Sequence, residues 1–234
     1  MKNLNYLILL LFSMSIISCS TDNSEGGINL TISAINSTTS KSALSQNKVK
    51  AQVIFTDFRI SIRDVIFKND DDDASSLDTD EVQFRGPYQI DLLDGSNALS
   101  QTIGNVFVPD GLYKELRFKF HKDENLPDSD KLFDRSIYME GTIDGVPFVF
   151  WHDTSENFDL GRSTGVLVQD GVVNFTVQFD MSQFLSSLNQ INLSLATDNN
   201  GDGLIEIFPN DDDGNQDIAK DLKENIKMAA DLIN

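Results

Sequence analysis

VFVPDGLYKELRFKF, residues 106–120, is the stretch that indicates the fold most clearly. Its second half alternates between apolar and charged side chains, since charged residues separate Leu116, Phe118 and Phe120. Successive side chains of a β-strand point to opposite faces of the sheet, so one face of this segment is apolar and the other is charged. This is the pattern of a strand that is buried on one face only.

Several other segments show the same alternation and extend the β pattern through most of the chain. They cover residues 28–33, 53–67, 88–93, 137–141, 146–152 and 173–179. The alternation slips by one residue between Phe55 and Phe58 and again between Ile62 and Val65, which predicts a bulge or a corner at each place. We therefore expect a mainly β fold, an antiparallel β-sandwich formed by one domain over residues 28–197.

Two dipeptides in the second half of the sequence predict tight turns. They are Asp144-Gly145 and Asp170-Gly171, and each lies between two alternating segments. Asp-Gly is favoured in two-residue hairpin turns, because both residues there adopt positive φ angles. We therefore expect a β-hairpin at each dipeptide.

Two short motifs resemble a known family. The run V-P-D-G-L-Y-K-E-L-R-F, residues 108–118, is similar to the "vPaGxYxxiRl" signature of uncharacterised bacterial lipoprotein domains of the Bacteroidetes type. In that family a strand with a "DLL" pattern precedes the signature, as Asp91-Leu92-Leu93 does here. The resemblance spans roughly residues 28–196 and implies a transthyretin-like β-sandwich. That family carries no agreed activity, so the resemblance implies a fold and almost no function.

The N-terminal segment has the features of a bacterial lipoprotein precursor. Residues 1–18 combine a positive end with an apolar run that is too short to span a bilayer, which predicts a secretory signal peptide. The tetrapeptide I-I-S-C at residues 16–19 resembles a lipobox, where cleavage before the Cys is accompanied by its lipidation. We expect lipid on Cys19, a flexible tether over residues 19–27, and a location on the outer membrane, facing the periplasm or the cell surface. A soluble secreted protein with a chance Cys is the alternative.

The mature chain is strongly acidic. The sequence has 18 basic and 37 acidic residues, and removal of Lys2 with the signal peptide leaves a net charge of −20. This charge argues against binding to nucleic acid or to anionic lipid. It favours a solvated protein that has cation sites.

The acidic stretch DNNGDGLIEIFPNDDDGNQD, residues 198–217, has the spacing of a calcium loop. Asp198, Asn200 and Asp202 occupy positions 1, 3 and 5, and Gly203 occupies position 6, where the chain must turn sharply. Ca²⁺ takes about six to eight oxygen ligands, which alternate residues of a tight loop can supply. The stretch therefore predicts a structural Ca²⁺ site.

The end of this loop departs from an EF-hand. Position 12, a bidentate Glu in EF-hands, is Pro209, and residues 191–195 before the loop alternate like a strand. The loop therefore resembles the D-x-N-x-D-G loops of extracellular calcium modules, with the missing carboxylate supplied by one of several later Asp residues, among them Asp212. The candidate ligands are Asp198, Asn200, Asp202, Leu204 through its carbonyl, Glu206, Asp211, Asp213 and Asp217. The alternative is an acidic surface turn before a helix, whose positive end favours carboxylates.

The C-terminal residues 218–234 predict an amphipathic helix. Ile218, Leu222 and Ile226 recur at helical spacing and would form its apolar face. We expect this helix to pack on the sandwich, and we expect Ca²⁺ to fix it to the last strand.

Two further clusters each have a functional and a structural interpretation. His152 is followed by Asp153, Glu156 and Asp159, and a His-carboxylate pair can act as a general base, but a strand-end His is the favoured interpretation.

The aromatic group of Phe148, Phe150 and Trp151 could form a platform for sugar rings. Aromatic residues on a sandwich strand are more often core residues, however, since burying each one is worth a few kcal/mol.

No catalytic motif is found in the sequence, and three functions remain. The first is a non-enzymatic lipoprotein that binds a glycan, a peptide or a protein partner. The second is a structural or assembly component of an outer-membrane uptake or adhesin system. The third is a carboxylate-dependent hydrolase.

Overall fold

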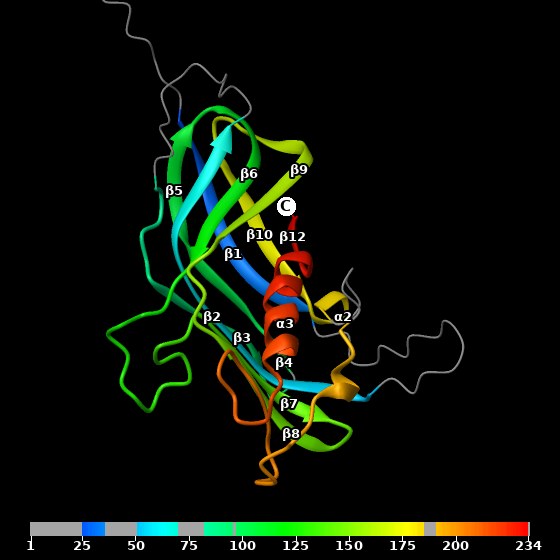
Figure 1. The fold of residues 1–234 in the computed structure, drawn as a ribbon. Coiled ribbons are helices and arrows are strands. Elements are labelled where there is room, and N and C mark those ends of the chain that lie inside the picture. The colour runs from blue at the N-terminus through cyan, green and yellow to red at the C-terminus, as the bar shows by residue number, and fades with distance from the viewer. Residues whose placement is uncertain (1–24, 36–50, 70–81, 96, 185–190, 234) are drawn as a thin grey trace, which may run out of the picture.

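The computed structural model describes residues 25–35, 51–69, 82–95, 97–184 and 191–233. The predicted signal peptide, Cys19 and most of the predicted tether lie outside the described residues. The described chain forms two β-sheets packed as a sandwich, with one long helix beside them (Figure 1). This confirms the predicted mainly β sandwich with a helix near the C-terminus.

The smaller sheet has four strands in the order β12-β10-β1-β5. Their bounds are β12 (Ala230–Ile233), β10 (Val172–Asp180), β1 (Glu25–Ile35) and β5 (Ser100–Pro109). β5 and β12 pair with their neighbours in the predicted antiparallel sense, whereas β1 and β10 are parallel.

The larger sheet has eight strands, and β2 (Val53–Asn69) is central to it. The first half of β2 lies between β7 and β3, and its second half pairs with β6, which in turn pairs with β9. β8 pairs antiparallel with β7 and parallel with the edge strand β11. The remaining bounds are β3 (Tyr88–Asp94), β4 (Asn97–Ala98), β6 (Gly111–Phe120), β7 (Ile137–Ile143), β8 (Val146–His152), β9 (Asn157–Val168) and β11 (Ile205–Ile207).

The core lies between the inward faces of the two sheets. As predicted from the alternation in β6, Leu116, Phe118 and Phe120 are completely buried. Phe58 of β2 meets Phe179 of the smaller sheet edge to face, with ring centroids 5.6 Å apart. Complete burial of such a side chain stabilises the fold by about 1.5–3 kcal/mol, so the apolar faces hold the two sheets together.

Both predicted interruptions of β2 are present. The register of β2 against β7 shifts between Phe55 and Asp57. Its register against β6 shifts between Arg63 and Ile66, where Asp64 has a φ of 52°. These irregularities let a single 17-residue strand change its partners along its length.

The two Asp-Gly dipeptides form different connections. Asp144-Gly145 makes the predicted hairpin turn between β7 and β8, with φ angles of 51° and 86°. The hairpin predicted at Asp170-Gly171 is wrong, because β9 pairs with β6 whereas β10 pairs with β1. This turn carries the chain from one sheet to the other, and the amide of Gly27 donates a hydrogen bond to the carbonyl of Gly171 at 2.6 Å.

β1 begins at Glu25, so the tether predicted over residues 19–27 is too long at its C-terminal end. Gly26 and Gly27 belong to the strand and pair with β5. A Cβ atom on Gly26 would lie 2.4 Å from Cγ1 of Val168, so the missing side chain permits a close approach. The glycine pair reflects packing within the sandwich instead of a flexible linker.

The helix predicted over residues 218–234 ends early. After Met228 the chain enters β12, which pairs with β10 and buries Ala230 and Leu232. Residues 230–233 therefore form an edge strand of the smaller sheet instead of the last turn of the predicted helix. The helical segments in the part of the chain that the structure describes are α2 (Met181–Phe184), the 3₁₀ turn η1 (Leu193–Leu195) and α3 (Gln216–Met228). None of the helices in the described ranges is long and apolar enough to cross a membrane.

Candidate calcium loop and the adjoining pocket

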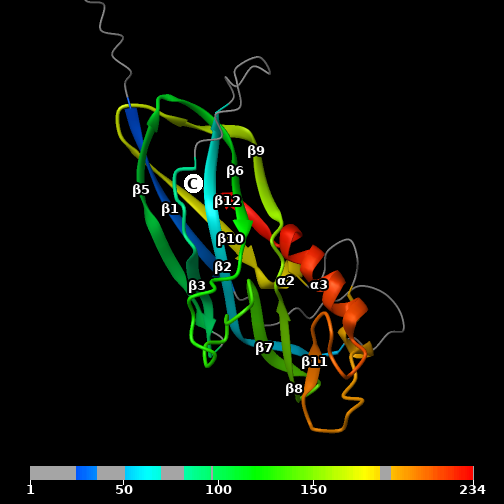
Figure 2. The ribbon, with the colours of Figure 1, turned by 60° about the vertical axis from the view of Figure 1, so that its left-hand side comes forward.

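The acidic stretch lies between η1 and α3, at the end of the molecule opposite the start of β1 (Figures 1 and 2). The strand predicted just before it, over residues 191–195, is wrong, because this segment forms η1. The side chain of Asn192 accepts a hydrogen bond from the amide of Ser194 at 3.2 Å, which favours a turn over an extended strand. Leu195 is consequently 68% exposed.

The first half of the acidic stretch winds around its own side chains at positions 1, 3 and 5. Asp198 accepts hydrogen bonds from the amides of Gly201 at 2.7 Å and Gly203 at 2.8 Å, through its two carboxylate oxygens. Asn200 Oδ1 accepts one from the amide of Asp202 at 2.9 Å. Gly203 has a φ of 90°, so the glycine at position 6 supplies the predicted sharp turn.

Asp213 braces the loop from within and is only 1% exposed. Its Oδ1 accepts hydrogen bonds from the amides of Asn199 at 2.9 Å and Asn200 at 3.1 Å. Its Oδ2 accepts another from the amide of Glu206 at 2.8 Å. Hydrogen bonds from several backbone amides stabilise an ionised carboxylate, so the protein itself compensates this buried charge.

Asp211 has a similar role where the loop meets α3. It accepts hydrogen bonds from the amides of Asn215 at 2.8 Å and Phe208 at 3.3 Å. Asn215, the residue before α3, donates through Nδ2 to the carbonyls of Thr197 at 2.9 Å and Glu206 at 2.7 Å. These bonds join both ends of the loop to the start of the helix.

Negative potential concentrates at Glu206. Its Oε2 accepts a hydrogen bond from Asn200 Nδ2 at 3.4 Å, which brings loop positions 3 and 9 together. Partial burial, together with the charges of Asp213 and Asp202, raises the pKa of the Glu206 carboxyl. A bound cation would favour the ionised form of this group.

The eight predicted ligands thus divide by their positions. The outer turn of the loop holds Asp198, Asn200, Asp202, Leu204 and Glu206. Asp211 and Asp213 bind backbone amides, and Asp217 is exposed in the first turn of α3, where the helix dipole favours a carboxylate.

Across the described ranges, no group of three or more His, Cys, Asp or Glu side chains is arranged to hold a metal ion. A calcium centre on the outer turn would therefore need the amide oxygen of Asn200 and a backbone carbonyl as well as carboxylates. Both are ligands that Ca²⁺ accepts. The donor chemistry of the loop is thus compatible with Ca²⁺.

A pocket of about 560 Å³ adjoins the loop on the outer face of the larger sheet. The acidic stretch contributes Leu204, Glu206 and Phe208 to its lining. The sheet and the segment before β7 contribute Arg135, Tyr138, Glu140 and Trp151, among others. The pocket is therefore formed jointly by the acidic stretch and the sandwich.

The predicted aromatic platform is divided by the alternation of β8. Phe148 and Phe150 face the core and are 2% and 0% exposed. Trp151 faces outward and stacks on Phe208, with ring centroids 4.8 Å apart. Phe148 and Phe150 are therefore core residues, as the structural interpretation predicts. The sugar platform stays a prediction, and the stacking partner of Trp151, Phe208, was not indicated by the sequence.

A charge network at the rim of the pocket was not predicted from the sequence. Lys131 Nζ lies 2.8 Å from Asp57 Oδ2 and 2.7 Å from Glu140 Oε2, and Arg59 Nε donates to Asp57 Oδ1 at 2.9 Å. The hydroxyl of Tyr138 donates to Glu140, and burial together with this bond raises the pKa of Tyr138. Asp57 is buried at the first bulge of β2. The slip in alternation between Phe55 and Phe58 was the only feature of the sequence that pointed to this position.

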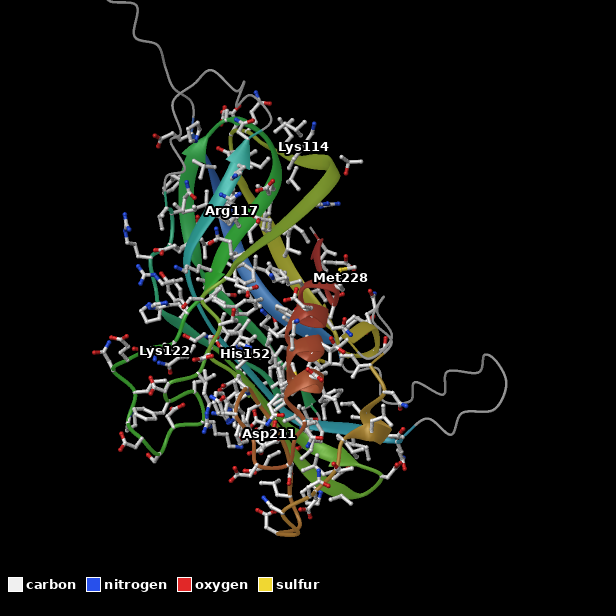
Figure 3. The ribbon with its side chains drawn as sticks, in the orientation of Figure 1. Lys114, Arg117, Lys122, His152, Asp211 and Met228 are labelled. Atoms are coloured by element: carbon white, nitrogen blue, oxygen red, sulfur yellow. The ribbon has the colours of Figure 1, made fainter. Side chains whose placement is uncertain are left out.

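Of the acids that follow His152, Asp153 lies beside it, whereas Glu156 and Asp159 pair with basic side chains. His152 Nδ1 lies 3.5 Å from Asp153 Oδ1, and burial lowers the pKa of His152. Glu156 binds two lysines of α3, and Asp159 pairs with Arg117, which lies well apart from His152 in Figure 3. His152 is the last residue of β8, as the strand-end interpretation predicts.

Comparison with protein-family models, curated proteins and solved structures finds no match to this chain. The resemblance to bacterial lipoprotein domains therefore stays a prediction. The fold and the site define a class only, a β-sandwich with an acidic loop of calcium-binding sequence pattern beside a mixed aromatic and polar pocket.

Proposed function

We propose that this protein is a non-enzymatic, lipid-anchored binding module of the outer membrane, whose pocket takes a neutral glycan. The main support is the composition of the pocket, which combines stacked aromatic rings with hydrogen-bonding groups. Its volume, about 560 Å³, lies in the range of about 300–1,000 Å³ that is usual for small-molecule sites.

The charges around the pocket favour an uncharged ligand. Glu206, with Asp202 and Asp213 near it, disfavours an anion. A cationic ligand would bind over the aromatic rings, but Arg135 already lies there, 5.1 Å from the centroid of Trp151. Sugar hydroxyls both donate and accept hydrogen bonds, so they match the carboxylate and the guanidinium together.

The acidic loop is proposed to bind one structural Ca²⁺ ion through Asp198, Asn200, Asp202, Glu206 and the carbonyl of Leu204. The ion would favour the ionised form of Glu206, whose pKa is raised by burial and by the charges of Asp213 and Asp202. Because the loop supplies part of the pocket lining, the ion would also hold the pocket in shape.

The proposed anchor is lipid on Cys19, at the end of the lipobox-like segment. Acyl chains on this residue would hold the protein on the outer membrane, facing either the periplasm or the cell surface. The net charge of −20 after signal removal supports a solvated protein that does not bind nucleic acid.

Binding to immobilised neutral oligosaccharides tests the glycan proposal, with sulfated oligosaccharides as the comparison. We expect the wild-type protein to bind the neutral set, and we expect Phe208→Ala to lose at least about tenfold in affinity, or about 1.4 kcal/mol. Met228→Ala, a change at an exposed residue at the end of α3, should bind like wild type. Equal binding by both variants, or binding of the sulfated set alone, contradicts the proposal.

The second candidate, an assembly component, has one observation in its favour. Apolar side chains are exposed at the end of the sandwich opposite the pocket, at Phe107, Leu167 and Val172. The third candidate, a carboxylate-dependent hydrolase, has two carboxylates in the pocket lining, Glu140 and Glu206. Glu140 is already bound by Lys131 and Tyr138, so the aromatic and polar composition of the pocket favours the binding module.

A further inference from the structure

We infer that the end of the sandwich at the start of β1 docks on the lipid surface that holds the anchor. This inference rests on the proposed lipidation of Cys19. The docking surface consists of Phe107, Leu167 and Val172, which are 70%, 60% and 57% exposed. They are three of the four most exposed large apolar side chains in the described ranges, and we call them the apolar end.

Strand pairing places two of these residues together. Phe107 and Val172 both pair with Gly27, and directly paired residues of a sheet project to the same face. Gly27 has no side chain to separate them, so they form one apolar row on the outer face of the smaller sheet. Leu167 projects outward from the larger sheet at the same end, because its neighbours along β9 are buried.

The outer face of the smaller sheet becomes polar directly beyond this row. Asn29 Nδ2 donates to Asn174 Oδ1 at 2.9 Å, and in the following row the hydroxyls of Thr31 and Thr102 are 3.2 Å apart. The most exposed apolar side chains of this face thus lie at the tip, and those farther along it, Ile35 and Ile233, are only 38% and 37% exposed. Such a distribution suits shallow insertion of the tip into an interface, and it does not suit contact along the whole face.

The position of the proposed anchor indicates that the apolar end contacts lipid. Cys19 precedes Glu25, the first residue of β1, by six positions. Six residues span at most about 20 Å, even when fully extended. Since Gly27 pairs with Phe107, the anchor holds the apolar end within reach of the bilayer to which it is attached.

The charge around the tip defines the kind of lipid. Glu25 pairs with the end of β5, and Asp110 and Asp170 lie in the two turns at this tip. Lys114 lies at the same end (Figure 3), so the charge of the described residues there is mixed and has no basic excess that would select an anionic surface. The apolar end therefore suits a zwitterionic surface.

Docking at this tip would present the pocket to the solvent. The acidic loop and β11 lie at the opposite end of the elongated sandwich (Figures 1 and 2). The proposed binding site would therefore point away from the membrane, where a soluble or surface-bound glycan can reach it.

Site-directed spin labelling of the lipidated full chain tests this arrangement. The chain has a single Cys, so once lipid occupies Cys19, Phe107→Cys offers a unique thiol for a nitroxide. The labelled protein is reconstituted into vesicles of phosphatidylcholine and phosphatidylethanolamine, and collisions with oxygen and with a water-soluble nickel chelate are measured. Leu195→Cys, 68% exposed beside the acidic loop, is the matched control.

We expect the label at position 107 to be several-fold less accessible to the nickel chelate than the label at 195, and more accessible to oxygen. Equal access at the two positions, with lipid confirmed on the N-terminal peptide by mass spectrometry, overturns docking and leaves the anchored binding module standing. A free thiol on that peptide overturns the anchor and docking together. Protection at position 107 only in native membranes, and not in protein-free vesicles, would assign the apolar end to a protein partner and overturn docking on lipid.

Discussion

The indole of Trp151 stacks on the ring of Phe208, with centroids 4.8 Å apart and planes inclined by 19°. Trp151 belongs to β8, whereas Phe208 follows β11 in the acidic stretch. The pairing of β8 with β11 covers three residues of each strand, and this stack adds a side-chain contact between the sandwich and the loop. It also forms a wall of the pocket.

Removing the Phe208 ring should loosen this contact. We expect Phe208→Ala to lower the free energy of unfolding by about 1–2 kcal/mol, less than a fully buried Phe would, because Phe208 is partly exposed. Trp151 is the single Trp of the chain, so its fluorescence emission should shift to longer wavelength. Denaturant unfolding and emission spectra measure both effects, with Met228→Ala as the control. Unchanged emission in Phe208→Ala would show that the stack is absent in solution.

Asp213 is expected to be the acid on which the loop depends most for stability. Asp213→Ala leaves three backbone amides without their acceptor, and each unsatisfied buried group costs about 1–3 kcal/mol unless water reaches it. Asp213→Asn keeps one acceptor oxygen and should fall between Asp213→Ala and wild type. Urea unfolding measures this order. Asp212→Ala, at an exposed neighbour, should be close to neutral, and an equal loss in both alanine variants would contradict the bracing role.

Glu156 should contribute stability that is lost in acid. Hydrogen bonds from Lys223 and Lys227 lower its pKa from 4.5 to about 2. Because the folded-state pKa is the lower one, its contribution is complete above about pH 4.5 and disappears as the pH falls towards 2. The side chain is 43% exposed, so solvent screening limits the contribution to about 1 kcal/mol or less.

Urea unfolding of Glu156→Gln across this pH range tests the prediction. The difference in stability from wild type should be largest near neutral pH, shrink in high salt, and vanish near pH 2. Asp221→Asn, at an exposed acid of α3, the helix that carries Lys223 and Lys227, should not show this dependence. A difference that stays constant from neutral pH to pH 2 would show that the two ion pairs are not formed.

The strands could be predicted because burial of one face of a strand requires apolar side chains at every second position. The alternation of Leu116, Phe118 and Phe120 identifies the buried face of β6. The slips in alternation along β2 mark the positions where its register against β7 and β6 shifts. The alternation of apolar and polar residues does not show which strands are neighbours in the sheet. Asp144-Gly145 and Asp170-Gly171 carry the same turn signal, yet only the first joins two paired strands.

The site was predictable only where its contacts are local. Asp198, Asn200 and Asp202 lie a few residues from the amides they bind, so their spacing describes the turn. The stack of Trp151 on Phe208 and the contact of Lys131 with Asp57 join residues far apart in the chain. Contacts of this kind produce no repeating pattern in the sequence. Residues 230–233 fit a helical period, but the free edge of β10 offers them strand pairing instead.

A thermal melt of the mature chain without lipid, in excess Ca²⁺ and then with a chelator, tests the proposed calcium loop most directly. At 100 times the dissociation constant, Ca²⁺ should stabilise the folded state by about 2.7 kcal/mol, which raises Tm by roughly 5–10 °C for a chain of this size. Asp202→Ala should lose this rise, whereas Asp217→Ala, changed at an exposed acid of α3, should keep it. An equal Tm for the wild-type protein in Ca²⁺ and in chelator would contradict the calcium site and leave residues 198–217 as an acidic turn that its own hydrogen bonds hold in place.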